Sequence, residues 1–167
     1  KVKLLENATS VPDLEKSENG ESMVVATLGR VSDQKNPLMF LELATSFQTY
    51  NNLLFKWIGG GTAEYTELFK GCKNVELTGW LDRNNALKEL ANADIYVQLS
   101  KYEGMPIAVI EAMQLGKPVI VTNVPGNKDV VKNGVTGFII NDLSELEHRL
   151  KEILADHKLR KTISLAA

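Results

Sequence analysis

The sequence has little that would support a disulfide, a metal site or a membrane span. Cys72 is its single cysteine, which excludes an internal disulfide, and the two histidines, His148 and His157, lack the spacing of a zinc site. Apolar runs stay well short of the roughly 20 residues that a membrane-spanning helix needs, and no signal-peptide core follows Lys1. We therefore expect a cytoplasmic domain that holds no metal.

An excess of basic charge is missing as well. The 167 residues include 19 Lys and Arg against 21 Asp and Glu, which gives a formal net charge of −2. A nucleic-acid-binding domain usually gathers surplus basic residues on one face, so we expect no nucleic acid partner. Hydrophobic residues make up 44% of the chain, enough for the core of one domain. An anionic ligand would have to be met by a few well-placed cations.

Short apolar runs alternate with amphipathic stretches from residue 23 onward. Residues 6–22 are polar and turn-rich, and we interpret residues 1–22 as a linker or edge segment from an N-terminal domain that this chain lacks. The domain itself would be residues 23–167. The spacing predicts strands at residues 23–29, 53–59, 75–79, 94–100, 118–122 and 137–140. It predicts helices at residues 37–50, 63–70, 83–93, 106–115 and from about 144 onward.

This alternation predicts an α/β fold, a Rossmann-like doubly wound parallel sheet of about six strands with helices on both faces. Strands that are unbroken apolar runs are covered on both sides, and right-handed crossovers connect them. Helix caps are expected at Asn36, Thr62 and Asp82, and a helix end at Gly116. Ligands of such sheets bind beyond the carboxyl ends of the strands. The loops of interest are therefore residues 29–36, 59–62, 79–82, 100–106 and 122–129.

The first of these loops, "GRVSDQKN", carries two cations. Arg30 follows the first strand and Lys35 precedes the first helix, so both side chains and the helix N-terminus can converge on one anion such as a phosphate. The competing interpretation is that both are solvated loop charges. The loop "GGGT" lacks the Lys-Ser/Thr ending of a P-loop, which favours a tight turn with Thr62 as a helix cap. Close approach of its backbone to a ligand stays open, because glycine leaves room.

The segment "KYEGMPIAVIEAMQLGKP", residues 101–118, holds two glutamates. Glu103 lies in the loop after the fourth strand, whereas Glu111 lies inside a helix that is apolar nearly all round. Such a helix is buried, and a buried carboxylate is costly unless something pairs with it. Glu111 is close enough to the helix start to face the cleft and accept hydrogen bonds from ligand hydroxyls. The alternative is that it marks one solvent-facing strip of an ordinary covering helix.

The E-x7-E pattern in "EGMPIAVIE", together with "GRVSDQK" and "GKPVIVT", resembles the donor-binding half of the retaining glycosyltransferases of the glycogen-synthase-like, two-Rossmann-domain type (family 4, GT-B). The resemblance runs from about Gly29 to Gly137 in order and spacing. It implies a hexosyltransferase of two such domains, whose N-terminal domain binds most of the acceptor. This C-terminal domain, inactive alone, would bind a nucleoside-diphosphate sugar, expected to be a UDP-sugar, without a metal or other cofactor.

The resemblance also implies roles for individual residues. Arg30 and Lys35 would hold the donor diphosphate and neutralise charge on the leaving group, as catalytic residues. Glu103, also catalytic, would lie at the donor sugar, and Glu111 would contact the ribose. Further ligand contacts would come from the backbone N–H groups of Gly104, Met105 and Ile107 and from a loop beside the base formed by Gly79, Trp80 and Leu81.

Some positions depart from the family pattern and leave the donor sugar unassigned. Many relatives have Phe-Gly where this chain has Met105 and Pro106. Two other functions stay open, a non-catalytic module that binds a nucleotide-sugar and one half of a nucleotide-sugar epimerase. A phospho-receiver domain is excluded, because Arg30, Thr78 and Gly79 stand where it needs acidic residues. Any membrane association is expected to be peripheral and to involve only the missing half.

Overall fold

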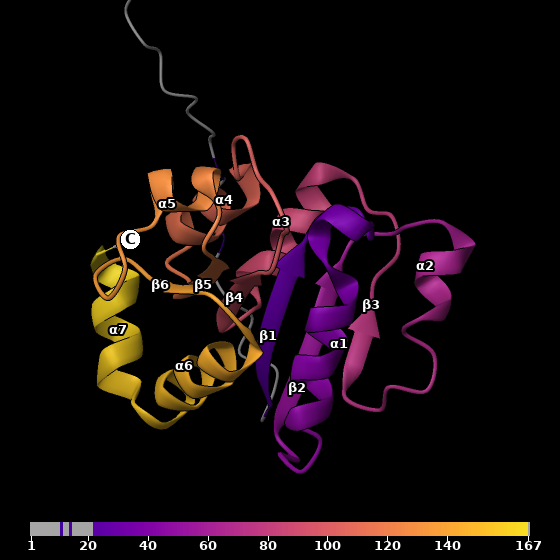
Figure 1. Cartoon of the computed structure of the whole chain (residues 1–167), viewed down its shortest axis with the longest axis horizontal. Coiled ribbons are helices and arrows are strands. Elements are labelled where there is room, and N and C mark those ends of the chain that lie inside the picture. Colours follow the sequence, from indigo (N-terminus) through magenta and orange to yellow (C-terminus); the bar gives the residue numbers. More distant parts are fainter. Residues whose placement is uncertain (1–10, 12–13, 15–21, 167) are drawn as a thin grey trace, which may run out of the picture.

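Six parallel strands form the sheet of the described structure (Figure 1). The structure is a computed structural model that describes Val11, Leu14 and residues 22–166, so the predicted linker lies almost entirely outside it. The strands are β1 (Met23–Leu28), β2 (Leu53–Ile58), β3 (Val75–Leu77), β4 (Ile95–Gln98), β5 (Val119–Thr122) and β6 (Phe138–Ile140). Every strand pairing is parallel and the order is β3-β2-β1-β4-β5-β6, which confirms the predicted Rossmann-like, doubly wound fold.

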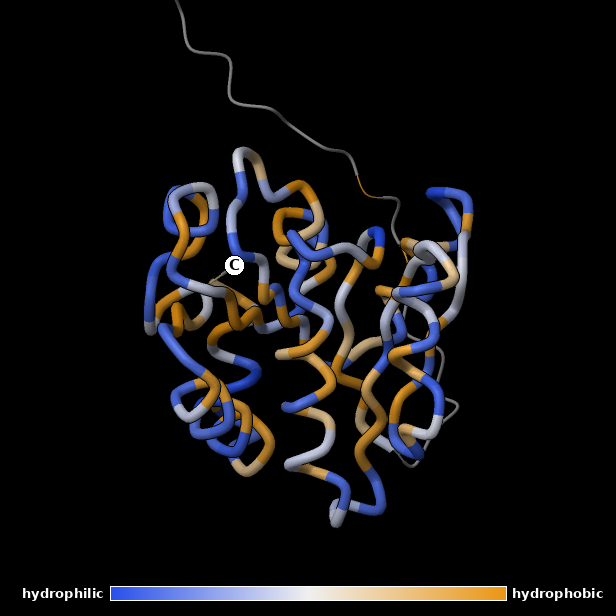
Figure 2. The backbone as a smooth tube through the Cα atoms, turned by 45° about the vertical axis from the view of Figure 1, so that its right-hand side comes forward, coloured by the Kyte–Doolittle hydropathy of each residue, from blue (hydrophilic) through white to orange (hydrophobic). Residues whose placement is uncertain are grey.

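Helices cover both faces of this sheet. They are α1 (Pro37–Ser46), α2 (Ala63–Glu67), α3 (Arg83–Ala91), α4 (Ile107–Gln114), α5 (Pro125–Val130), α6 (Leu143–Ala155) and α7 (His157–Ala166), with a 3-10 turn, η1 (Asp33–Lys35), after β1. α1 and α6 pack on one face through Phe40, Leu43 and Leu150, while α3 and α4 pack on the other through Leu87 and Val109. Figure 2 shows hydrophobic residues concentrated along the strands in the middle of the molecule. Within the described residues, no helix is long and apolar enough to cross a membrane.

Strand β4 divides its side chains between these two faces. Ile95 and Val97 belong to the core beneath α1 and α6, whereas Tyr96 belongs to the core beneath α3 and α4. The two-residue period of a strand places Gln98 on the same side as Tyr96. Gln98 is 1% exposed. A polar side chain is thus buried at the carboxyl end of β4, directly before the loop that carries Glu103.

Helix α5 lies where the sequence predicts a loop over residues 122–129, so that prediction is wrong from residue 125 onward. Pro125–Val130 are helical, and Pro125 takes the first helical position, which suits its fixed φ. Six residues show too little periodicity to reveal a helix next to a Pro-Gly pair that is typical of turns. A Cβ at Gly126 would lie 2.7 Å from the carbonyl oxygen of Gly104 and 2.8 Å from that of Glu103. Glycine therefore allows α5 to lie directly against the loop after β4.

The expected helix caps are found in position, but only one of the three N-caps forms its hydrogen bond. Asp82 Oδ1 accepts from the backbone N–H of Asn85 at 3.0 Å at the start of α3. Gly116, with a φ of +66°, follows the end of α4 as predicted. Asn36 and Thr62 precede α1 and α2 without a side-chain cap hydrogen bond. Both of these helices end earlier than predicted, at the bounds given above.

Candidate functional site

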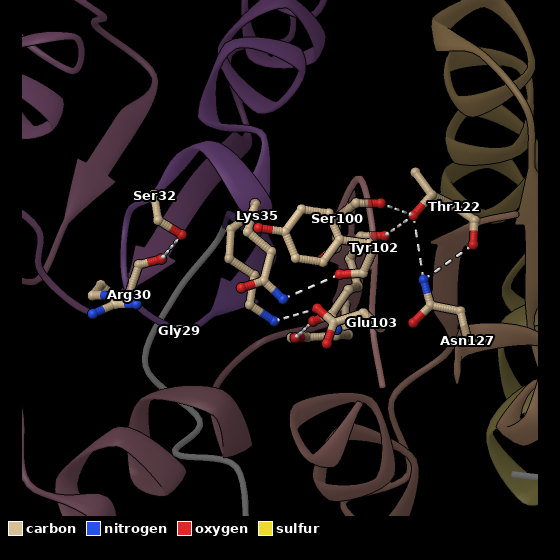
Figure 3. A network of polar contacts seen from close by, with 12 residues as sticks. Gly29, Arg30, Ser32, Lys35, Ser100, Tyr102, Glu103, Thr122 and Asn127 are labelled. Carbon is tan, nitrogen blue, oxygen red and sulfur yellow. Dashed lines mark hydrogen bonds and ion pairs between the residues drawn. The ribbon is translucent and has the colours of Figure 1, made fainter. Parts of the chain in front are cut away.

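The loops that follow β1 and β4 are joined into one unit, because these strands are neighbours in the sheet. The backbone N–H of Lys101 donates to Gln34 O at 2.8 Å, and Gln34 Nε2 donates to Tyr102 O at 3.1 Å. Lys101 Nζ also lies 2.5 Å from Asp33 Oδ1. Figure 3 shows Lys35 from the first loop lying next to Tyr102 and Glu103 from the second. The two loops follow the carboxyl ends of their strands, the edge where the sequence predicts a ligand site.

Lys35 and Glu103 meet at this edge. Lys35 Nζ lies 2.6 Å from Glu103 Oε1, and the two side chains are 19% and 6% exposed (Figure 3). A Cβ at Gly29 would lie 3.3 Å from Lys35 Cε, so the stem of the lysine packs over the glycine that follows β1. The ion pair is largely shielded from water, which strengthens it relative to an exposed pair. Two of the predicted site residues, 68 positions apart in the sequence, are thus brought together.

Glu103 has a second partner that the sequence analysis missed. Gln98 Nε2 donates to Glu103 Oε1 at 3.1 Å, and the Tyr96 hydroxyl donates to Gln98 Oε1 at 2.6 Å. Burial raises the pKa of the Tyr96 phenol, which therefore stays protonated. The feature of the sequence that could have revealed this contact is Gln98 itself, a polar residue within the largely apolar run "DIYVQLS".

Glu111 is buried within α4 and paired. Its side chain is 4% exposed and forms an ion pair with Arg83 Nη1, on the first residue of α3. The interpretation of Glu111 as a solvent-facing strip is therefore wrong: the cost of burying the carboxylate is offset by a cation from the neighbouring helix. The side chain of Arg83 is 55% exposed. Arg83 is, after Gln98, the second residue of the site that the sequence analysis missed. Glu103 and Glu111 thus have different cationic partners, Lys35 and Arg83.

Arg30 is exposed and does not share the Lys35–Glu103 contact. Figure 3 shows its side chain extending away from Lys35, on the far side of Gly29. The predicted convergence of Arg30 and Lys35 on one anion therefore stays a prediction.

The glycines after β2 allow close packing between loops. A Cβ at Gly59 would lie 2.2 Å from the carbonyl oxygen of Gly29, and one at Gly60 would lie 2.8 Å from the Trp80 ring. Gly79, with a φ of +75°, forms an isolated bridge with Gly59. This packing agrees with the tight-turn interpretation of "GGGT". It also places the Trp80 indole, 67% exposed, over the loop after β2, with Leu81 next to it in the chain and also exposed.

The start of α4 offers two of the three backbone donors that were predicted. The N–H of Ile107 donates to Met105 O at 3.0 Å, so it is used within the loop. Among the described residues, the N–H groups of Gly104 and Met105 donate no hydrogen bond. Both residues are exposed beside Glu103. They can therefore meet an anionic or hydroxylated ligand without breaking an existing contact.

The candidate site is an open edge rather than an enclosed cavity. A hollow of about 250 Å³ adjoins it, lined among others by Asn36, Ser100 and Thr122. A larger hollow of about 810 Å³ lies beside Met23 and Leu53, at the amino ends of β1 and β2, and is remote from the residues described above. In the part of the chain that the structure describes, no group of three His, Cys, Asp or Glu side chains is arranged to hold a metal ion.

Curated relatives of this chain include glycosyltransferases. A UDP-Gal:alpha-D-GlcNAc-diphosphoundecaprenol alpha-1,3-galactosyltransferase of Escherichia coli is 36% identical over 150 residues, which are 83% of this chain and 38% of that protein. The sulfoquinovosyl transferase SQD2 of Arabidopsis thaliana is 30% identical over 155 residues, 88% of this chain and 29% of that protein. The chain thus spans less than half the length of these curated relatives.

Solved structures share the fold. The C-terminal domain of the glycosyl transferase group 1 family protein LpcC from Francisella tularensis matches with a TM-score of 0.78 at 20% identity, over 92% of this chain and 91% of that domain. Anabaena HepE in complex with UDP-glucose matches with a TM-score of 0.78 at 20% identity, over 87% of this chain and 42% of that protein. The family of glycosyl transferases group 1 matches residues 13–167. By this match, which extends over most of its length, the chain belongs to the glycosyl transferases group 1.

Proposed function

We propose that the chain is the nucleotide-sugar-binding domain of a retaining glycosyltransferase that moves a hexosyl group from a UDP-sugar to an acceptor hydroxyl. The observation that carries the proposal is the shielded Lys35–Glu103 pair at the carboxyl ends of two adjacent strands, in a chain of this family. This pair supports the proposal because a diphosphate is bound by cations and sugar hydroxyls donate to carboxylates. HepE, which has the same fold, binds UDP-glucose.

Each part of the donor has a candidate partner at this edge. Lys35 and Arg30 stabilise the diphosphate and the charge that develops on it as the glycosidic bond breaks. Glu103 accepts hydrogen bonds from sugar hydroxyls, and the N–H groups of Gly104 and Met105 donate to the ligand. Glu111 accepts from the ribose, which requires Arg83 to share or leave its carboxylate. The loop of Gly79, Trp80 and Leu81 borders the base.

The acceptor is bound mainly by an N-terminal domain that faces the same edge. Apolar side chains of Tyr102, Met105 and Ile107 are 61%, 42% and 45% exposed around Glu103, a surface that a second domain and the ligand would cover. We expect the chain alone to be inactive in transfer, to use no metal and no nucleic acid, and to act in the cytoplasm. Any contact with a membrane would be peripheral and made by the other domain. Membership of the family favours transfer over epimerisation or simple nucleotide-sugar sensing.

Calorimetric titration of the chain with UDP, ADP, GDP and their glucose conjugates tests this proposal. We expect UDP to bind, and Arg30→Ala, Lys35→Ala and Glu111→Ala each to weaken it, because each variant removes a donor or acceptor that the ligand uses. Lys158→Ala, which removes an exposed cation in α7, is the matched control and should bind UDP like the unmodified chain. Unchanged affinity in all three site variants would contradict the site.

A further inference from the structure

A buried line of two hydrogen bonds runs from the core to Glu103. It starts at the Tyr96 hydroxyl, passes through the Gln98 amide and ends at Glu103 Oε1, with donor–acceptor distances of 2.6 and 3.1 Å. Tyr96 is 0% exposed and Gln98 is 1% exposed. Polar groups buried this deeply are costly unless they are hydrogen-bonded, so an apolar residue would suit the end of β4 better if packing alone mattered.

Both hydrogen bonds of this line run in the same direction, with the donor on the Tyr96 side and the acceptor on the Glu103 side. Because burial raises the pKa of the Tyr96 phenol, its hydroxyl remains a donor and takes the carbonyl oxygen of the Gln98 amide. The NH₂ group of the amide is then turned toward Glu103, whose carboxylate can only accept. Turning the amide over would set its oxygen against the carboxylate, where two acceptors repel. Tyr96 supports the observed orientation by donating to the amide oxygen.

Both contacts on Glu103 fall on the same oxygen. Lys35 Nζ lies 2.6 Å from Oε1, and Gln98 Nε2 lies 3.1 Å from the same atom. Among the described residues, Oε2 accepts no hydrogen bond, so it is the atom with capacity for a ligand hydroxyl. Lys35 is also the cation proposed for the diphosphate. When its ammonium turns toward phosphate, Gln98 is the contact that still fixes the carboxylate.

We infer that Gln98 is a positioning residue that holds Glu103 in the orientation that binds the donor sugar, and that Tyr96 acts through Gln98. The inference rests on the proposed function. Gln98 is 1% exposed and lies behind Glu103, the residue proposed to bind the sugar. Its substitution should therefore weaken the binding of UDP-sugars and leave the binding of UDP unchanged.

NMR-detected titration of the chain with UDP, UDP-glucose and UDP-galactose tests this role. Gln98→Met keeps the length of the side chain but removes both hydrogen bonds. For whichever UDP-sugar binds the unmodified chain more tightly, we expect Gln98→Met to raise the dissociation constant on the order of tenfold, because a hydrogen bond to a charged group is lost. The dissociation constant of UDP should change by less than about twofold. Tyr96→Phe should have a smaller effect of the same kind. The double variant should be no weaker than Gln98→Met alone, because Tyr96 acts only through Gln98.

Retained UDP affinity shows that each variant is folded, and Val97→Ala is the matched control. Val97 is buried in the same strand but belongs to the other core, so its substitution should change the affinities for UDP and for the UDP-sugar by the same factor. Equal weakening of UDP and UDP-sugar by Gln98→Met, or no change in either, would overturn the inference while leaving the proposed function intact. Failure of the unmodified chain to bind any of the three ligands would overturn the proposed function itself.

Discussion

At the scale of single residues, two ion pairs in the same pair of loops differ in their surroundings. The side chains of Lys35 and Glu103 are 19% and 6% exposed, whereas those of Lys101 and Asp33 are 46% and 70% exposed. Water and side-chain entropy cancel most of the energy of an exposed pair. A shielded pair is different, because removing one partner leaves the other charge with less compensation. The two lysines should therefore contribute unequally to stability.

Replacing each lysine by methionine tests this difference. We expect Lys35→Met to lower the free energy of unfolding by about 1–3 kcal/mol, since Gln98 still donates to the carboxylate that loses its cation. Lys101→Met should change it by less than about 0.5 kcal/mol. Urea denaturation at neutral pH measures both. Equal losses for the two variants would show that the Lys35–Glu103 pair is as well solvated as the surface pair.

At the scale of elements, the short helix α5 supports the loop that carries Glu103. Asn127, which is 0% exposed, donates from Nδ2 to Thr122 O at 3.0 Å, and Thr122 Oγ1 donates to Ser100 O at 2.6 Å (Figure 3). These bonds connect α5 to the ends of β5 and β4. Gly126 completes the contact, because a Cβ there would lie only 2.7 Å from Gly104 O and 2.8 Å from Glu103 O. A side chain there has to displace backbone rather than a flexible side chain.

Gly126→Ala is therefore expected to destabilise the chain, although alanine is ordinarily the better helix residue by roughly 0.5–1 kcal/mol. The steric conflict with two carbonyl oxygens should outweigh that gain and cost about 1–3 kcal/mol in the free energy of unfolding. Backbone amide chemical shifts of Glu103 and Gly104 should move as the loop is displaced. Gly104→Ala is the control, because a Cβ there meets no atom within 4 Å. A Gly126→Ala variant as stable as the unmodified chain would show that α5 can shift without effect on this loop.

At the scale of the whole molecule, the sequence predicted the order of strands and helices better than it predicted which side chains contact the site residues. Largely apolar runs such as "VIVT" predicted all six strands, because a strand covered on both faces is mostly apolar. Loop positions predicted that Lys35 and Glu103 lie at one edge. Their direct contact, the Arg83–Glu111 pair and the hydrogen bond from Gln98 to Glu103 were not predicted, because the side chain that reaches a carboxylate depends on helix packing and rotamers. Glu111 and Arg83 are 28 positions apart and come from different helices.

The two tryptophans allow a test of whether the base stacks on Trp80. Trp57 is 1% exposed, packs edge-on against Phe40 at 5.2 Å and lies in the core, whereas Trp80 is 67% exposed at the proposed border of the base. Stacking of a base on an exposed indole changes its emission, so UDP should alter the fluorescence of the chain through Trp80. In Trp80→Phe, the remaining emission of Trp57 should be insensitive to UDP but shift to the red on unfolding in urea. The indole N–H of Trp57 donates to Gly29 O at 2.8 Å, beside Lys35, so a UDP-induced change that persists undiminished in Trp80→Phe would come from Trp57 and would contradict stacking of the base on Trp80.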